Sequence, residues 1–245
     1  MREHRLFAPL QLRVGDQIAL GEKATHYLSK VLRLREGTEI VLFNGDGKDY
    51  RCKLTGFGRQ QVAAQVLECT PNAAESPLRV TLVQALSRGE RMDYCLQKAT
   101  ELGVSAVQLL LSERVELKLA GSRLEKRMAH WRGVVESACE QSGRARLPEL
   151  LPPLGIETWL DGSGQEVVMQ RLVLDAGAVM TLGQLKPCQS FELAVGPEGG
   201  FTDAELSLMG SSGVVGVRLG PRTLRTETAG PAALAVLQSM FGDWA

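Results

Sequence analysis

A pair of glycine–proline turns near the C-terminal end constrains the fold more than any other feature of this sequence. Gly196-Pro197 follows an apolar run at residues 191–195, and Gly220-Pro221 follows another at residues 214–219. Each turn leads toward the expected start of a helix. The pattern therefore predicts a strand, a loop of bare backbone and a helix N-terminus, present twice in this part of the chain.

The residues after the first turn favour close approach of the backbone to a ligand. Gly199 and Gly200 lack a Cβ atom, so the chain there can adopt positive φ and expose its amide groups. Thr202, with Glu205 three residues later, forms a capping-box pattern. We therefore expect a helix to start directly after the glycines.

The second turn differs from an ordinary loop because arginines surround it. Arg218, Arg222 and Arg225 lie within a few residues of Gly220. Guanidinium groups beside bare backbone indicate an anionic partner, because they donate paired hydrogen bonds to carboxylates and phosphates. One glycine–proline turn alone would be structural, since such turns are common in any α/β domain. Two of them, one with three arginines, predict a pocket formed by amides of both loops.

At these residues the chain resembles a known family. The run G-P-E-G-G-F-T-x-x-E, followed by L-G-P-R-x-L-R-T-E-T-A, is similar to the signature of the RsmE family of 16S rRNA uridine-N3 methyltransferases. That family belongs to the SPOUT superfamily. Family-like blocks also occur at residues 90–104, in E-Q-S-G-R at 140–144, in R-L-F-A-P near the start and at residues 26–37, so the resemblance covers nearly the whole chain.

The resemblance implies an α/β fold with two domains. Residues 1–72 would form a PUA-like RNA-binding β-barrel, and residues 73–245 a SPOUT methyltransferase domain with a C-terminal trefoil knot around a parallel sheet. It also implies S-adenosyl-L-methionine as the cofactor, 16S rRNA or the 30S ribosomal subunit as the partner, and a homodimer formed through the SPOUT domain. Knots are rare, and spacing or periodicity does not reveal one.

Composition is compatible with such a protein. The net charge of the chain is zero, yet 23 of its 28 Lys and Arg residues lie in residues 1–146, which hints at a polyanionic partner. No apolar run is long enough to span a membrane, and no signal peptide or metal-binding cluster is visible. The five cysteines are scattered and odd in number, so we expect reduced thiols and a cytoplasmic location.

The sequence of the first domain predicts short strands joined by turns. Strand-like patterns occupy residues 10–20, 39–43, 50–55 and 61–67, with a hairpin turn at Asn44-Gly45-Asp46-Gly47. Residues 26–34 suit a short amphipathic helix. Residues 70–77 have the composition of a linker, and we place the domain boundary there.

From Leu78 onward, strands alternate with helices, which predicts a parallel sheet covered on both faces. We expect strands at residues 78–86, 106–111, 167–175 and 191–195, and helices at residues 91–102 and 123–142. Pro231 would clash deep inside a helix, so the last helix is expected to start near Thr228 and run to about Met240.

Arg222 and Arg225 are the candidate catalytic residues, because an arginine beside the base would stabilise negative charge that develops on uracil. Positioning a phosphate is the rival role for either. Glu198 could contact the cofactor or orient its own loop, and Glu227 could contact the cofactor or cap its helix; the structural role is favoured for each. By resemblance, the cofactor-binding residues are Val195, Gly196, Glu198, Gly199, Gly200, Leu219, Gly220, Leu224, Thr226, Glu227 and Thr228.

The expected RNA contacts are basic residues. Arg5 lies in the family-like R-L-F, where the family usually has a second arginine at the position of His4. The remaining candidates are Arg33, Arg35, Arg51, Lys53, Arg59 and Arg144.

Two other functions fit the same features. One is a SPOUT methyltransferase that acts on tRNA or on a ribose 2′-O, and the other is a non-catalytic RNA-binding factor in ribosome assembly. The intact glycines of both loops argue against the non-catalytic factor. A nicotinamide-binding enzyme is disfavoured because no G-x-G-x-x-G follows the first strand of the α/β part.

Overall fold

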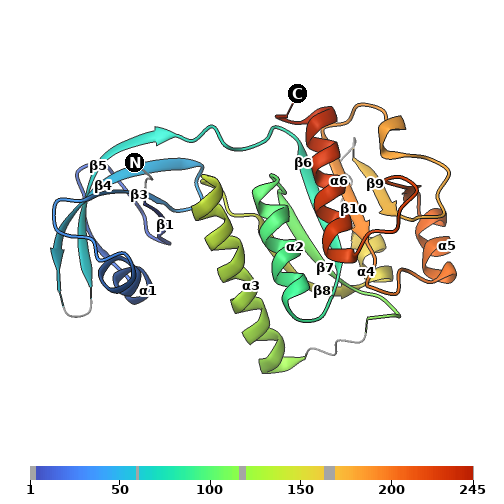
Figure 1. The fold of residues 1–245 in the computed structure, drawn as a ribbon, viewed down its shortest axis with the longest axis horizontal. Coiled ribbons are helices and arrows are strands. Elements are labelled where there is room, and N and C mark those ends of the chain that lie inside the picture. The colour runs from blue at the N-terminus through green and yellow to red at the C-terminus, as the bar shows by residue number, and fades with distance from the viewer. Residues whose placement is uncertain (1–3, 59–60, 116–119, 163–168, 245) are drawn as a thin grey trace. The chain divides into compact units, whose positions relative to one another are not determined.

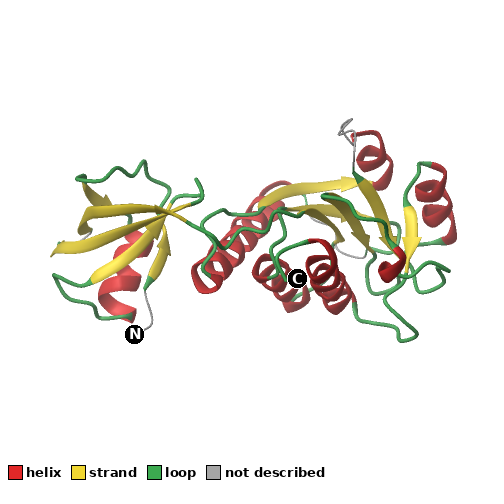
Figure 2. Cartoon of the chain, turned by 90° about the horizontal axis from the view of Figure 1, so that it is seen from above, coloured by secondary structure: helices red, strands yellow, loops and turns green. Residues whose placement is uncertain are grey.

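The computed structural model describes residues 4–58, 61–115, 120–162 and 169–244. The chain forms two compact units, one of Met1–Glu75 with Cys139–Leu147 and one of Ser76–Ala138 with Pro148–Ala245. The division falls at residue 75 rather than 72, and the first unit also takes in a segment from much later in the sequence. Figures 1 and 2 show the chain in two views.

The first unit is a five-stranded sheet folded around its own core. The strands follow the order β1-β3-β4-β5-β2. Leu28, Leu42, Leu54, Val62 and Ala64 are among the side chains fully buried inside it. The elements are β1 (Arg5–Phe7), β2 (Gln17–Leu20), α1 (Glu22–His26), the π-helical turn Tyr27–Val31, β3 (Glu39–Phe43), β4 (Lys48–Phe57) and β5 (Val62–Pro71).

Most of the expected elements of this unit are confirmed. β3 has the expected bounds, and positive φ at Gly45 and Gly47 closes its turn into the antiparallel strand β4. The strand expected at residues 10–20 is wrong over its first half, because only β2 pairs with β5. The helix begins at Glu22, before the expected residue 26.

Buried charges hold the late segment in the first unit. Arg144 is 5% exposed, and its Nη2 lies 2.8 Å from Glu75 Oε2. Arg5 donates two hydrogen bonds to Asp49, at 2.8 and 2.9 Å, and one to the Arg144 carbonyl oxygen. The Phe7 amide donates to Glu140. The E-Q-S-G-R run therefore ties the segment to β1 and β4.

This network bears on the expected RNA contacts. Arg5 and Arg144 use their guanidinium groups inside the unit, so the structure gives them a packing role in place of a surface one. Arg51 is exposed and pairs with Glu68. Arg33, Arg35 and Lys53 are exposed, and Arg59 lies outside the described residues.

The second unit is built on a six-stranded sheet in the order β11-β9-β10-β6-β7-β8, and every neighbouring pair is parallel. The α/β class and the parallel sheet are thus confirmed. Its strands are β6 (Arg79–Ala85), β7 (Ala106–Leu111), β8 (Glu149–Gly155), β9 (Gln170–Leu174), β10 (Ser190–Val195) and β11 (Val215–Val217). Its helices are α2 (Glu90–Glu101), α3 (Gly121–Ser142), α4 (Ile156–Gly162), the 3₁₀ turn Leu182–Gln184, α5 (Asp203–Ser211) and α6 (Thr226–Phe241).

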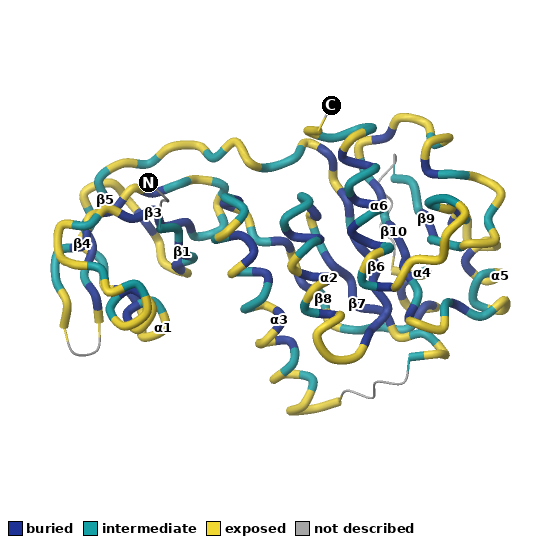
Figure 3. The backbone as a smooth tube through the Cα atoms, in the orientation of Figure 1, coloured by how far each residue is buried: buried dark blue, intermediate teal, exposed yellow. Residues whose placement is uncertain are grey.

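Alternation along β6 sends side chains to both faces of this sheet. Val83 packs with Trp159 of α4 and Met209 of α5 on one face. On the opposite face a Cβ atom at Gly230 of α6 would lie 3.3 Å from Leu82 and Gln84, so α6 lies directly on β6. The central strands are buried between these layers, as Figures 2 and 3 show.

Sequence reasoning missed β8, which contains Pro152 and Pro153. Proline in a run argues against a strand because it cannot donate to the ladder. β8 accommodates both prolines because it lies at the sheet edge, and its register with β7 shifts between Gln108 and Leu110.

The start expected for the last helix is wrong. α6 begins at Thr226 with Arg225 as its N-cap, and the amides of Thr228 and Ala229 both donate to the Arg225 carbonyl. Pro231 therefore lies in the sixth helical position and is buried. No described helix is both long and apolar enough to cross a lipid bilayer.

Replacing Glu75 with alanine should destabilise the first unit, because it leaves the buried Arg144 guanidinium without its carboxylate. The expected loss is about 3 kcal/mol. Amide hydrogen exchange of β4 and β5 in the full-length protein reports it locally. Glu68→Ala is the matched control, since its pair with Arg51 is about half exposed and is worth less than about 1 kcal/mol. Equal effects of the two variants would contradict the packing role.

Candidate functional site

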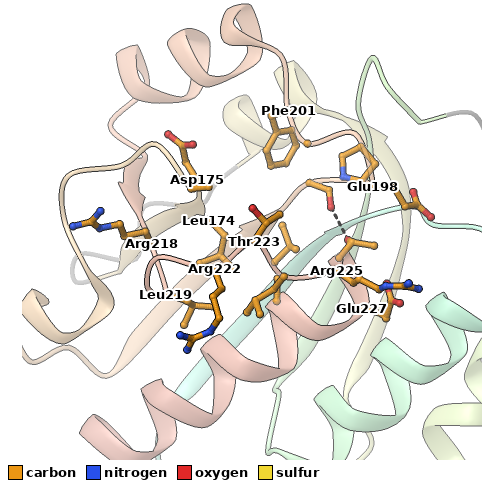
Figure 4. Close-up of a pocket in the computed structure, with 18 of the residues that line it drawn as sticks. Leu174, Asp175, Glu198, Phe201, Arg218, Leu219, Arg222, Thr223, Arg225 and Glu227 are labelled. Carbon is orange, nitrogen blue, oxygen red and sulfur yellow. Dashed lines mark hydrogen bonds between the residues drawn. The ribbon is translucent and has the colours of Figure 1, made fainter.

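The two glycine–proline loops meet at one cavity. Its volume is about 470 Å³, and it lies beyond the carboxyl ends of three neighbouring parallel strands, β11, β9 and β10 (Figure 4). Ligands of open α/β sheets bind at this edge, because the loops that follow each strand converge there. The volume is within the range of small-molecule sites, about 300–1,000 Å³.

The first loop follows β10 and places its backbone on the cavity wall. A Cβ atom at Gly196 would lie 3.1 Å from the Phe201 amide nitrogen and 3.2 Å from Gly200, so a larger residue would crowd the backbone of this tight turn. Gly200 has φ +70°. The expected capping box is confirmed, because Thr202 and Glu205 exchange hydrogen bonds and α5 starts at Asp203.

The second loop follows β11 and carries the arginines. Arg218, Arg222 and Arg225 all line the cavity and are exposed. Within the described residues, none of the three makes an ion pair with a carboxylate. Their positive charges are therefore available to an anionic group at the cavity mouth.

A chain of buried hydrogen bonds joins the two loops beneath the cavity. The Thr226 hydroxyl donates to the Gly196 carbonyl at 2.6 Å and accepts from Gln84 Nε2 at 3.0 Å. The Cys95 thiol lies 3.3 Å from Gln84 Oε1. Burial raises the pKa of Cys95 to about 12, so the thiol keeps its proton and can donate. Thr226 and Gln84 are 6% and 0% exposed, which makes each of these bonds difficult to replace with water.

A second link runs closer to the surface. Arg91 of α2 places Nη1 2.6 Å from Glu198 Oε1 and Nε 3.9 Å from Glu227 Oε1. Partial burial acts to raise the pKa of Glu198, but the backbone amides of Glu198 and Arg88 and the Arg91 guanidinium lower it, and the net direction is down. The carboxylate therefore stays ionised and holds the first loop against α2.

A neighbouring cavity of about 1070 Å³ shares Arg91 and Glu198 with the first. Gly199 lines this second cavity, where Arg114 donates to its carbonyl oxygen at 2.6 Å. Among the described residues, no group of three His, Cys, Asp or Glu side chains is arranged to hold a metal ion.

The structure brings most of the expected site residues together. Thr228 is exposed on the first turn of α6 and does not line the main cavity, and Gly199 lines only the neighbouring one. The expected residues that line the main cavity are Val195, Gly196, Glu198, Gly200, Leu219, Gly220, Arg222, Leu224, Arg225, Thr226 and Glu227.

Sequence reasoning missed several residues of the site. Asp175 and Phe201 line the cavity, and Arg91 and Gln84 anchor its loops. Asp175 ends a strand that the sequence predicts, so its place at the carboxyl edge of a parallel sheet was a usable signal. For Gln84, the only signal in the sequence was a polar residue within an apolar run.

Both parts of the chain match known protein families. A family model described as an RNA methyltransferase domain matches residues 74–238, and one described as an RNA methyltransferase PUA domain matches residues 20–67. The chain therefore belongs to a family of RNA methyltransferases.

Individual relatives narrow this class. The ribosomal RNA small subunit methyltransferase E of Buchnera aphidicola is 31% identical over 98% of this chain and 97% of its own. The Synechocystis protein of the same name is 36% identical over 96% of this chain and 76% of its own. A crystal structure of this methyltransferase from Neisseria gonorrhoeae, bound to S-adenosyl methionine, is 39% identical, covers all of both chains and has a TM-score of 0.93. Within the class, the chain thus belongs to the ribosomal RNA small subunit methyltransferase E family.

Replacing Thr226 with valine should lower stability, because valine has the shape of threonine but removes the hydroxyl that donates to the Gly196 carbonyl and accepts from Gln84 Nε2, which keeps only its bond to the Ala85 carbonyl. The expected loss is about 1–3 kcal/mol, measured by thermal unfolding. Thr226→Ser keeps the hydroxyl and should lose clearly less. If serine proves as destabilising as valine, the methyl group and not the hydrogen bonds stabilises this position.

Proposed function

We propose that this protein transfers a methyl group from S-adenosyl-L-methionine to N3 of a uridine in 16S rRNA of the small ribosomal subunit. The observation that carries the proposal is the convergence of both glycine–proline loops on one cavity edged by three arginines. The resemblance of both units to RNA methyltransferase domains adds support.

The cavity has the features that such a cofactor requires. S-adenosyl-L-methionine would supply an electrophilic methyl group, and its adenine needs backbone hydrogen bonds and an apolar slot. Gly196, Gly200 and Gly220 leave backbone accessible on the wall, and Val195, Leu219 and Leu224 are apolar lining residues. Glu198 and Glu227 would act through Arg91 to fix the two loops.

Chemistry at N3 requires charge stabilisation. The nitrogen must lose its proton, here to water, before it can take the methyl group, and the negative charge of that uracil anion is shared with the carbonyl oxygens until the new N–C bond forms. A cation fixed beside the base lowers the free energy of that state. Arg222 and Arg225 are placed at the cavity for this role, and one of them would position the adjacent phosphate.

The proposal extends to the assembly. Arg33, Arg35 and Lys53 of the first unit are exposed cations that would contact rRNA phosphates. A homodimer formed through the second unit, a C-terminal trefoil knot, a cytoplasmic location and the 30S subunit as substrate are part of the same proposal. Exposed Tyr94 on α2 is apolar surface that a dimer would cover.

Incubation with S-adenosyl-L-methionine and small subunits that lack the modification should yield 3-methyluridine. Nuclease digestion of the rRNA followed by nucleoside analysis identifies the product. A 2′-O-methylated nucleoside would contradict the proposed position of attack. Complete absence of methylation on subunits and on free 16S rRNA would contradict the proposed activity.

Arg222→Ala and Arg225→Ala separate the two arginine roles. The variant that removes charge stabilisation should lower kcat by about 100-fold with little change in cofactor affinity. The variant that removes a phosphate contact should mainly raise KM for RNA. Calorimetry and steady-state kinetics measure these quantities, and Lys186→Ala, an exposed cation outside the site, is the control. Unchanged kinetics in both arginine variants would exclude both charge stabilisation and phosphate contact by these residues.

A further inference from the structure

Helix α3 has a basic stripe along one side. We define it as Arg123, Lys126 and Arg127, which follow one another at the i, i+3, i+4 spacing that places side chains on one side of a helix. Arg123 and Lys126 are exposed and Arg127 is half-buried. Figure 3 shows that α3 carries both buried and exposed positions. Met128 and Trp131 are buried; Met128 lies on a different side of the helix, and Trp131, at i+4 from Arg127, borders the stripe.

Among the described residues, no carboxylate pairs with the charges of this basic stripe. In the described parts of the chain, none of its three residues makes an ion pair, whereas Arg51, Arg91, Arg144 and Arg171 each do. Of the three acidic residues of α3, Glu125 and Glu136 project away from the stripe at 3.6 residues per turn, and Glu140 lies near the far end of the helix.

Helix stability does not account for the stripe. Arg123 lies in the first turn of α3, which contains no acidic residue, and Lys126 and Arg127 lie in the second. Cations near a helix N-terminus oppose the helix dipole, which costs about 0.3–1 kcal/mol each in the first turn. A gain from binding would offset that cost.

The end of the stripe is fixed to α2. His130, at the next i+3 position after Arg127, lies with Nε2 2.7 Å from Asp93 Oδ2, and the Trp131 indole donates to Asp93 Oδ1 at 3.1 Å. The Asp93 carboxylate therefore contacts two side chains of α3, next to the last residue of the stripe. The helix beneath the three cations is held in one orientation, so they form a preorganised surface.

We propose that the basic stripe of α3 binds the phosphate backbone of the RNA substrate, away from the nucleotide that is methylated. This inference rests on the proposed function. The three residues span just over one helical turn, about 6 Å of helix axis, a length over which one nucleic-acid strand presents about two phosphates. Such contacts position the RNA without reading its sequence. The attraction is local, because the net charge of the whole chain is zero.

The test compares two double variants of the full-length protein. R123Q/K126Q removes two charges from the stripe. R132Q/K186Q removes two exposed charges outside it, and Arg132 lies on the opposite side of the same helix. The dissociation constant for an unmodified 16S rRNA transcript is measured at several salt concentrations. Thermal unfolding and S-adenosyl-L-methionine affinity check that both variants are folded.

The stripe variant should bind the transcript at least tenfold more weakly at low salt. The slope of log affinity against log salt should fall by about 1.4–1.8, because each phosphate that the protein no longer neutralises lowers it by about 0.7–0.9. The control variant should change neither the affinity nor the salt slope by a comparable amount. Equal slopes and affinities for the two variants would overturn the proposal, as would lost methylation with unchanged RNA affinity. A wild-type protein without methyltransferase activity would instead refute the proposed function.

Discussion

The hydrogen bond from the Thr226 hydroxyl to the Gly196 carbonyl joins the two loops on which the site depends. Gly196 leaves β10 and Thr226 opens α6, so this 2.6 Å contact fixes the distance between segments thirty residues apart. Gln84 extends the link to β6 in the centre of the sheet. The cavity therefore keeps its form through a few buried polar contacts, and these stabilise it only while every partner is present.

Arginine has two separate uses in this molecule. Arg91 and Arg144 are held by carboxylates and join elements that are distant in sequence. Arg222 and Arg225 line the cavity, and no carboxylate among the described residues pairs with them. The residue type does not reveal which use applies. Burial and the position of the nearest carboxylate decide it, and both depend on tertiary structure.

This dependence explains what sequence reasoning reached and what it missed. The bounds of β3 and β7 and the capping box at Thr202 follow from local patterns, and they were predicted. The convergence of the loops followed from the rule that parallel strands share a carboxyl edge. The start of α6, the place of residues 139–147 in the first unit and the partners of Gln84 depend on distant contacts, and no local pattern encodes them.

The two prolines of β8 also limit how copies of the chain can meet. An open strand edge is a template on which another chain can add a strand and begin to aggregate. Here one border of the parallel sheet is β8, where Pro152 and Pro153 remove two amide donors, and the other is β11, only three residues long. Neither border offers a long ladder of free donors, so association between copies through this sheet is directed to its helices and loops.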